Sequence, residues 1–354
     1  MQQKFYYYIL AAIIVTFVII SIPELSRPIQ NSWEIEHITY AIENCKEHGV
    51  PFQRAAFKFY QFCASEFVFG NHKIITFAES IGIILLVYLL TVKFTNKPYT
   101  GLIAASLIVG THTFIDNAPT GYNSTEWVFF LLLSIYMAFR KPALTGVFFA
   151  ITLFAKSITL FYLPFVIWII LKSDISKKSK KIAIISLVPV VALVILWTVF
   201  VGEHIIQWSV PILFNINDID TILYNPVYNF TVETFDYAYL FGFIPLSLLG
   251  LYLMKKQWRP AIPMLSMIVF MFTMQVWLPL FSGYPMGNYR NVAMMTFVAI
   301  SLGVLSNHKS KGVIEFVNKG TNKIKLFKVT FIMCFTPVIG YLVYYLIIGN
   351  KIFI

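Results

Sequence analysis

The stretch that decides the fold runs from Arg140 to Lys172 and reads RKPALTGVFFAITLFAKSITLFYLPFVIWIILK. Both of its flanks are basic, and Lys156 interrupts the apolar run between them. Basic residues that flank membrane-spanning helices stay preferentially on the cytoplasmic side, so a single crossing would conflict with the charge pattern. Two short helices over 143–171, with Lys156 and Ser157 at the tip, keep both flanks on one side. The sequence therefore predicts a helical hairpin.

The composition of the whole chain points to a membrane protein. Of its 354 residues, 58% are hydrophobic and only 12% are charged, and the mean hydropathy is +0.74. These charges are too few to cover a soluble globule of this size. The net charge of +11 comes from basic residues in short loops between apolar runs, where they contact anionic lipid. We expect one all-α, polytopic membrane domain over 1–354, with membrane lipids and no nucleic acid among its partners.

The number of spans follows from the thickness of a bilayer. About 20 apolar residues are needed for a helix to cross the hydrocarbon core. The runs that fit are 5–22, 74–93, 99–115, 125–139, 182–201, 237–254, 261–281, 289–306 and 328–348. With the hairpin they predict about eleven transmembrane segments, a cytoplasmic N-terminus and an external C-terminus. The expected location is the cell membrane.

Four outer loops follow from this topology, and most acidic residues lie in or beside them: 23–73, 116–124, 202–236 and 282–288. The first outer loop, 23–73, contains two amphipathic patterns, one from Asn31 to Gly49 and one from Arg54 to Phe69. Such helices are typical of segments that lie on a membrane surface. Cys45 and Cys63 both fall in this loop, where they form one disulfide bridge or remain two free thiols.

Glu34 and Glu36 are the candidate catalytic acids of the first loop. A carboxylate at the membrane surface can accept a proton from an incoming hydroxyl and so act as a general base. Asn31 followed by Glu34 also resembles a helix-capping box, which would give Glu34 a structural role. Glu36 is therefore the preferred base, and Glu34 is the alternative.

Asp116 and Glu126 bracket the second outer loop and are candidate substrate-binding acids. Glu126 opens a predicted span, where an acid is costly unless it faces a polar cavity or lies at the helix N-terminus. Both readings remain open. Glu79 lies inside the second predicted span, away from a capping position, so we expect it to be paired within the bundle.

Lys156 and Arg290 are cations on the side where basic residues are rare. Lys156 lies at the hairpin tip, and Arg290 follows Tyr289 at the start of a predicted span. A cation at this place suits the binding of a substrate phosphate. The alternative is that each side chain extends to a lipid headgroup.

The sequence contains none of the common metal-binding or nucleotide-binding motifs. The six histidines have no HxxxH spacing, and neither a phosphate-binding glycine loop, a CxxC pair nor a GxSxG motif occurs. The sequence predicts no metal site and no cofactor, although it leaves a divalent metal ion open.

Two regions resemble the polyprenyl-phosphate-sugar-dependent glycosyltransferases of the GT-C fold, a superfamily that includes protein mannosyltransferases and aminoarabinose transferases. One is the stretch 74–172, with its basic-Pro turn, its apolar helix containing glycine and its cation followed by aromatic residues. The other is the first loop, where Trp33-Glu34-Ile35-Glu36, Tyr40 and Gly49-Val50-Pro51 follow the order of the family's pattern. The family commonly has an Asp in the acidic pair, and this chain has none there. Tyr289-Arg290 is similar to a late element of the family near the donor phosphate.

The resemblance implies transfer of a sugar from a polyprenyl-phosphate donor to a hydroxyl of a lipid, glycan or protein acceptor, on the extracytoplasmic face. Glu36 or Glu34 would be the base, and Glu126, Asp116, Lys156, Tyr289 and Arg290 would bind substrate. Two other functions remain open. The intramembrane charges would also suit a transporter or lipid flippase, although no inverted repeat is present. The third is an inactive scaffold subunit with a GT-C-like fold.

Overall fold

The computed structural model is helical in the part of the chain that it describes. That part comprises residues 2–26, 43, 56–111, 114–115, 118–119, 125–201, 246–248, 251, 259–282 and 291–307. Its longer elements are α1 (Gln2–Ser26), α3 (Ala56–Phe69), α4 (Ile74–Thr95), α5 (Pro98–Val109), α7 (Thr125–Arg140), η1 (Pro142–Leu144), α8 (Thr145–Ala155), η2 (Ser157–Tyr162), α9 (Leu163–Lys172), α10 (Lys177–Val201), α14 (Ala261–Ser282) and α15 (Asn291–Leu305). The all-α class is therefore confirmed for these residues.

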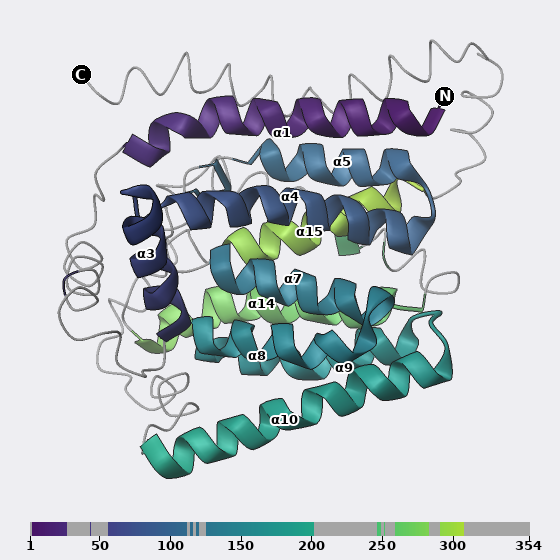
Figure 1. Ribbon diagram of the computed structural model, residues 1–354. Helices are drawn as coiled ribbons and strands as arrows, with labels where there is room; N and C mark the ends of the chain where they lie inside the picture. The colour runs from purple at the N-terminus through teal and green to yellow at the C-terminus, as the bar shows by residue number, and fades with distance from the viewer. Residues whose placement is uncertain are drawn as a thin grey trace.

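Most of these helices lie roughly parallel in one bundle, with α1 along one edge and α10 along the opposite edge (Figure 1). Helix α4 packs against α5 and α7, α7 packs against α8, and α8 packs against α10. Helix α3 is the exception, because it runs across one end of the bundle and contacts α4 and α8.

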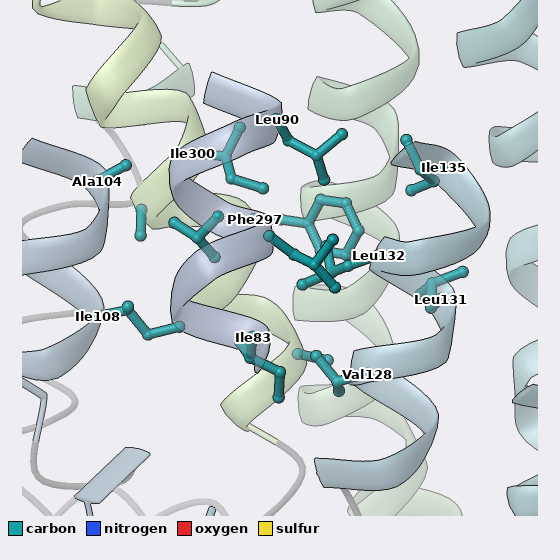
Figure 2. Packing of buried hydrophobic residues seen from close by; sticks show 14 of the residues in the cluster. Ile83, Leu90, Ala104, Ile108, Val128, Leu131, Leu132, Ile135, Phe297 and Ile300 are labelled. Carbon is teal, nitrogen blue, oxygen red and sulfur yellow. The ribbon is translucent and has the colours of Figure 1, made fainter. Parts of the chain in front are cut away.

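The centre of the bundle is filled by apolar side chains from four helices (Figure 2). Ile83 and Leu90 come from α4, Ile108 from α5, Leu132 from α7 and Phe297 from α15, and each is at most 1% exposed. Burial of such a side chain stabilises the folded state by about 1.5–3 kcal/mol. This core holds α4, α5, α7 and α15 in fixed positions, and so positions the polar residues at their ends.

Two of the described helices are long and apolar enough to cross a membrane, namely Lys4–Ser26 within α1 and Ile74–Thr95. Helices α5, α8, α9 and α15 are apolar but shorter. The predicted span 99–115 is too long, because α5 ends at Val109. Gly110 follows as the C-cap residue, and the Thr111 hydroxyl donates to the Ile108 carbonyl at 2.8 Å. Both features favour helix termination at this point.

The chain reverses within 142–172. Helix α8 ends at Lys156, whose backbone is extended, and η2 leads directly into α9. Both ends of the stretch lie beside the first half of α10, because the Ser186 hydroxyl donates to the Pro142 carbonyl at 3.3 Å and the Lys180 ammonium donates to the Leu171 carbonyl at 2.8 Å. Lys156 lies at the opposite end of α8 from these contacts.

Candidate functional site: the polar end of the bundle

The two ends of the bundle carry different charges. We call the end where α4, α7 and α9 finish and α5, α8 and α10 begin the basic end. Its described basic residues include Lys4, Lys93, Lys97, Arg140, Lys141, Lys172, Lys177, Lys178, Lys180 and Lys181. We call the other end, where α4 and α7 begin and α1 and α8 finish, the polar end. The charged residues of its described helices and turns include Glu24, Lys58, Glu66, Lys73, Glu79, Glu126 and Lys156, beside His72.

A hydrogen-bonded junction ties α1, α3 and α4 together at the polar end. The Ser65 hydroxyl donates to the Asn71 carbonyl at 2.7 Å and accepts from the Ile75 amide at 3.2 Å. The Asn71 side-chain amide donates to the Leu25 carbonyl at 3.2 Å. Gly70 makes the turn between α3 and α4 with a φ of +65°, a left-handed conformation that glycine adopts without strain. The junction fixes the direction in which α4 leaves α3.

Lys73 is a buried cation of this junction. Its side chain is only 2% exposed, and its ammonium donates to the Glu24 carbonyl at 3.0 Å. A buried ammonium is stable only with oxygen partners around it. Lys73 therefore joins the end of α1 to the start of α4, and its charge acts on the neighbouring His72.

His72 lies between Glu66 and the ring of Phe62. Its Nδ1 atom is 3.6 Å from the Glu66 Oε2 atom, and its ring packs edge-on to Phe62 with centroids 6.2 Å apart. Burial lowers the pKa of His72, the positive charge of Lys73 lowers it further, and Glu66 opposes both. His72 is thus held neutral over a wider pH range than a free imidazole.

The centre of the polar end is a pair of buried carboxyl groups on α4 and α7. The Gln61 amide of α3 donates a hydrogen bond to the Glu79 Oε1 atom. The Glu126 carboxyl acts electrostatically on Glu79, and the two acids lie near the starts of α4 and α7, which pack against each other. Within the described part of the chain, Glu79 Oε2 and both carboxyl oxygens of Glu126 are buried without a hydrogen-bond donor.

Glu126 is positioned by the start of α7. The preceding Thr125 hydroxyl donates to the Ala118 carbonyl at 2.8 Å and ties the second loop to the helix. The following Trp127 stacks on Tyr162, with centroids 5.7 Å apart and an angle of 3° between the rings. These contacts hold the first turn of α7 against η2. Buried oxygens that lack a donor are costly, so Glu126 has capacity to bind a ligand.

Lys156 lies at the same end, where α8 finishes. Its carbonyl accepts a 2.7 Å hydrogen bond from the hydroxyl of Thr159, a residue of η2. The side chain is half-buried. Because η2 also carries Tyr162, which stacks on Trp127, the turn after Lys156 contacts the turn that begins with Glu126. A cation and an acid predicted as site residues therefore occur at one end of the bundle.

The other predicted site residues lie outside the described part of the chain: Glu34, Glu36, Asp116, Tyr289 and Arg290. Two contributors were missed, Gln61 and Lys73. Gln61 was missed because the sequence of an amphipathic helix does not show which residue a side-chain amide will contact. Lys73 was missed because it was assigned to the first outer loop, 23–73. The expectation that Glu79 is paired inside the bundle is confirmed by its hydrogen bond with Gln61.

Cys63 of α3 is disulfide-bonded. This excludes two free thiols and confirms a bridge at Cys63, whereas the other predicted partner, Cys45, lies outside the described residues. No group of three or more His, Cys, Asp or Glu side chains in the described part of the chain is arranged to hold a metal ion. The polar end thus presents carboxyl groups, lysines and one neutral imidazole.

Comparisons with known proteins do not place the chain in a family. No family model matches it, and neither a curated protein nor a solved structure matches it.

Proposed function

We propose that the chain is a multi-pass membrane glycosyltransferase with a GT-C-like bundle of about eleven transmembrane segments. It transfers a sugar from a polyprenyl-phosphate donor to an acceptor hydroxyl on the extracytoplasmic face. The observation that carries the proposal is Glu126, a fully buried acid whose oxygens have no hydrogen-bond donor among the described residues. It shares the polar end with Lys156. An acid for a hydroxyl-rich substrate and a cation for its phosphate are what this reaction requires.

Two further observations support an extracytoplasmic polar end. The basic residues gather at the opposite end, which the positive-inside rule assigns to the cytoplasm. Cys63, on the helix that crosses the polar end, is disulfide-bonded, and disulfides persist in oxidising compartments outside the cytoplasm. Charge and redox chemistry therefore favour the same orientation.

The proposed reaction is a single displacement at the anomeric carbon. The acceptor oxygen bonds to this carbon while the bond from carbon to the phosphate oxygen breaks, and the polyprenyl phosphate leaves with the electron pair. Glu36, or alternatively Glu34, takes the proton of the acceptor hydroxyl. Lys156, Arg290 and Tyr289 bind the phosphate and stabilise its added charge, and Glu126 and Asp116 bind sugar hydroxyls. An inverting reaction of this kind needs no covalent glycosyl-enzyme.

One observation favours a second candidate, a transporter or lipid flippase. Glu79 and Glu126 are neighbours inside apolar helices, and paired acids at such positions commonly mark ion or proton pathways. The two candidates differ in which acids they need. A transferase depends on Glu36 or Glu34, whereas a transporter depends on Glu79.

The test is release of sugar from a panel of radiolabelled polyprenyl-phosphate sugars by membranes that contain the full chain. Wild type is compared with Glu36→Gln and Glu34→Gln at matched expression, and Glu43→Gln in the same loop is the control. We expect wild type and Glu43→Gln to turn over one donor, and one of the other two variants to lose turnover.

The proposal fails if wild type is inert with every donor while both Glu36→Gln and Glu34→Gln still complement a strain that lacks the protein. Complementation that is lost only in Glu79→Gln would then favour the transporter. Complementation that survives all three substitutions would favour a scaffold role.

A further inference from the structure

The proposed sugar transfer gives Glu79 no role and gives Glu126 only contacts with sugar hydroxyls, so the burial of both acids needs a further explanation. Glu126 is 1% exposed and Glu79 is 6% exposed, so neither can be solvated as a surface carboxylate is. They lie on two helices that pack against each other and begin at the same end of the bundle (Figure 1). Three of their four oxygens are buried without a hydrogen-bond donor in the described part of the chain.

The described charged side chains nearest the pair lie at the ends of α1 and α8, at the start of α4 and on α3. At the end of α1, Glu24 adds negative charge, and Lys73 sends its ammonium to the Glu24 carbonyl. On α3, Glu66 lies beside His72, and Lys58 is a further charged residue, one turn before Gln61. Lys156 lies at the end of α8, and the described parts of α5, α14 and α15 bring no charged side chain to this end. Among described groups, those that act on the Glu79 carboxyl are Glu126 and the Gln61 amide.

Two buried carboxylates side by side repel each other, and both lose hydration. A single proton removes the repulsion. It also turns one acid into an O–H donor, which is the kind of group that the three buried oxygens lack. Carboxyl pairs of this kind titrate as a unit.

We propose that Glu79 and Glu126 form a proton-binding site between α4 and α7, in which the pair shares one proton at neutral pH. Gln61 is its positioning residue, because the amide occupies Oε1 of Glu79 and leaves Oε2 for the shared proton. The site does not depend on the proposed sugar transfer, and its test involves no donor or acceptor.

The test uses dicyclohexylcarbodiimide, an apolar reagent that attacks protonated carboxyl groups. The carboxyl proton moves to one carbodiimide nitrogen, the carboxyl oxygen bonds to the central carbon, and an acyl shift to nitrogen gives a stable N-acylurea that retains every atom of both reactants. The full-length purified chain is treated in lipid nanodiscs from pH 5 to pH 9 in potassium buffer. Mass spectrometry of its peptides then reports which carboxyl groups have reacted.

We expect modification of Glu79 or Glu126 at neutral pH, with a yield that falls as the pH rises. In Glu126→Gln the repulsion is absent, so the midpoint for modification of Glu79 moves to lower pH by on the order of one unit. In Gln61→Met the hydrogen-bond donor that stabilises the Glu79 carboxylate is absent, so the midpoint for modification of Glu79 moves to higher pH. Glu66→Gln, a half-buried acid at the same end, is the matched control and leaves the midpoint unchanged.

Three results would overturn the proposal. The first is no modification of either acid between pH 5 and pH 9, which would show that both are ionised. The second is an unchanged midpoint in both Glu126→Gln and Gln61→Met, with the folding of each variant checked by gel filtration. The third is protection by sodium chloride at constant pH and ionic strength, which would show that the pair binds a metal cation instead of a proton.

Discussion

The two ends of the bundle are stabilised by different kinds of contact. At the basic end, backbones approach closely and turns are short: the Gly146 amide donates to the Ser186 hydroxyl at 3.0 Å, and the Thr95 and Thr100 hydroxyls are 2.6 Å apart. At the polar end, α3 crosses the bundle (Figure 1), and three carboxyl oxygens of Glu79 and Glu126 are buried without a donor in the described part of the chain. The basic end is thus closely packed, whereas the polar end has carboxyl oxygens that can still accept hydrogen bonds. Such capacity is typical of a ligand site.

The largest expected effect is at the closest backbone approach of the basic end. A Cβ atom at Gly146 would lie 1.6 Å from the Ser186 carbonyl oxygen, so Gly146→Val forces α8 and α10 apart. We expect a loss on the order of 4–5 kcal/mol of stability, and hence little folded protein. Fluorescence-detected gel filtration measures the amount of folded protein.

Gly82→Ala is the matched control for this substitution. There the new methyl group would meet only the ring of Phe129, which can move. If Gly82→Ala proved as damaging as Gly146→Val, the basic end would not be the more rigid of the two.

The disulfide at Cys63 supports the proposed extracytoplasmic position of the polar end, because disulfides persist in oxidising compartments. The chain has three cysteines, and we expect Cys45 to be the partner. A polyethylene-glycol maleimide should then add once to the denatured, unreduced chain and three times after reduction. Cys63→Ser should accept two adducts before reduction and lose about 3 kcal/mol of stability. Three adducts on unreduced wild type would contradict the assigned orientation.

A smaller effect is expected at the junction of α3 and α4. Ser65→Ala removes one donor from the Asn71 carbonyl and the acceptor of the Ile75 amide, and both groups are at the polar end. The expected cost is about 1–3 kcal/mol, measured as a lower thermal midpoint. Ser266→Ala, which loses only an exposed bond to its own helix, should stay within about 0.5 kcal/mol of wild type. Equal midpoints would show that the junction contributes little.

The smallest effect is the pH dependence at His72. Because burial lowers the pKa of His72 in the folded protein, the unfolded chain binds its proton first as the pH falls. Stability from the neutral imidazole is complete above the unfolded value of about 6.5 and falls through the folded value. Between pH 7 and pH 5 wild type should lose slightly more stability than His72→Gln. An equal loss would show that His72 is not linked to folding.

The sequence predicts the bounds of a helix well where polar residues stand at both ends of an apolar run. Lys73 and Asn96 bracket α4, and the predicted span 74–93 agrees with Ile74–Thr95 within two residues. The basic flanks predicted that the chain reverses near Lys156. The predicted span ran past Gly110 because Phe114 and Ile115 follow the polar residues 111–113, whereas the helix ends at Val109.

The contacts of the candidate site could be predicted only in part. Glu126 and Lys156 were recognised because each is a charge in apolar surroundings. The contact between Gln61 and Glu79, 18 residues apart, depends on the path of α3 across the bundle, and the neighbourhood of Glu79 and Glu126 depends on how α4 and α7 are rotated. Neither rotation nor crossing direction is encoded in the spacing of polar residues along one helix.

Helix α7 allows the most direct test of whether the polar end is the catalytic end, because it has Glu126 near one end and Arg140 at the other. Sugar release from the donor that wild type uses is measured for Glu126→Gln and for Arg140→Gln, with Lys141 kept so that the turn remains basic. We expect Glu126→Gln to lose turnover by about 100-fold and Arg140→Gln, an exposed residue, to stay near wild type. Full activity of Glu126→Gln, or equal loss in both variants, would contradict the account.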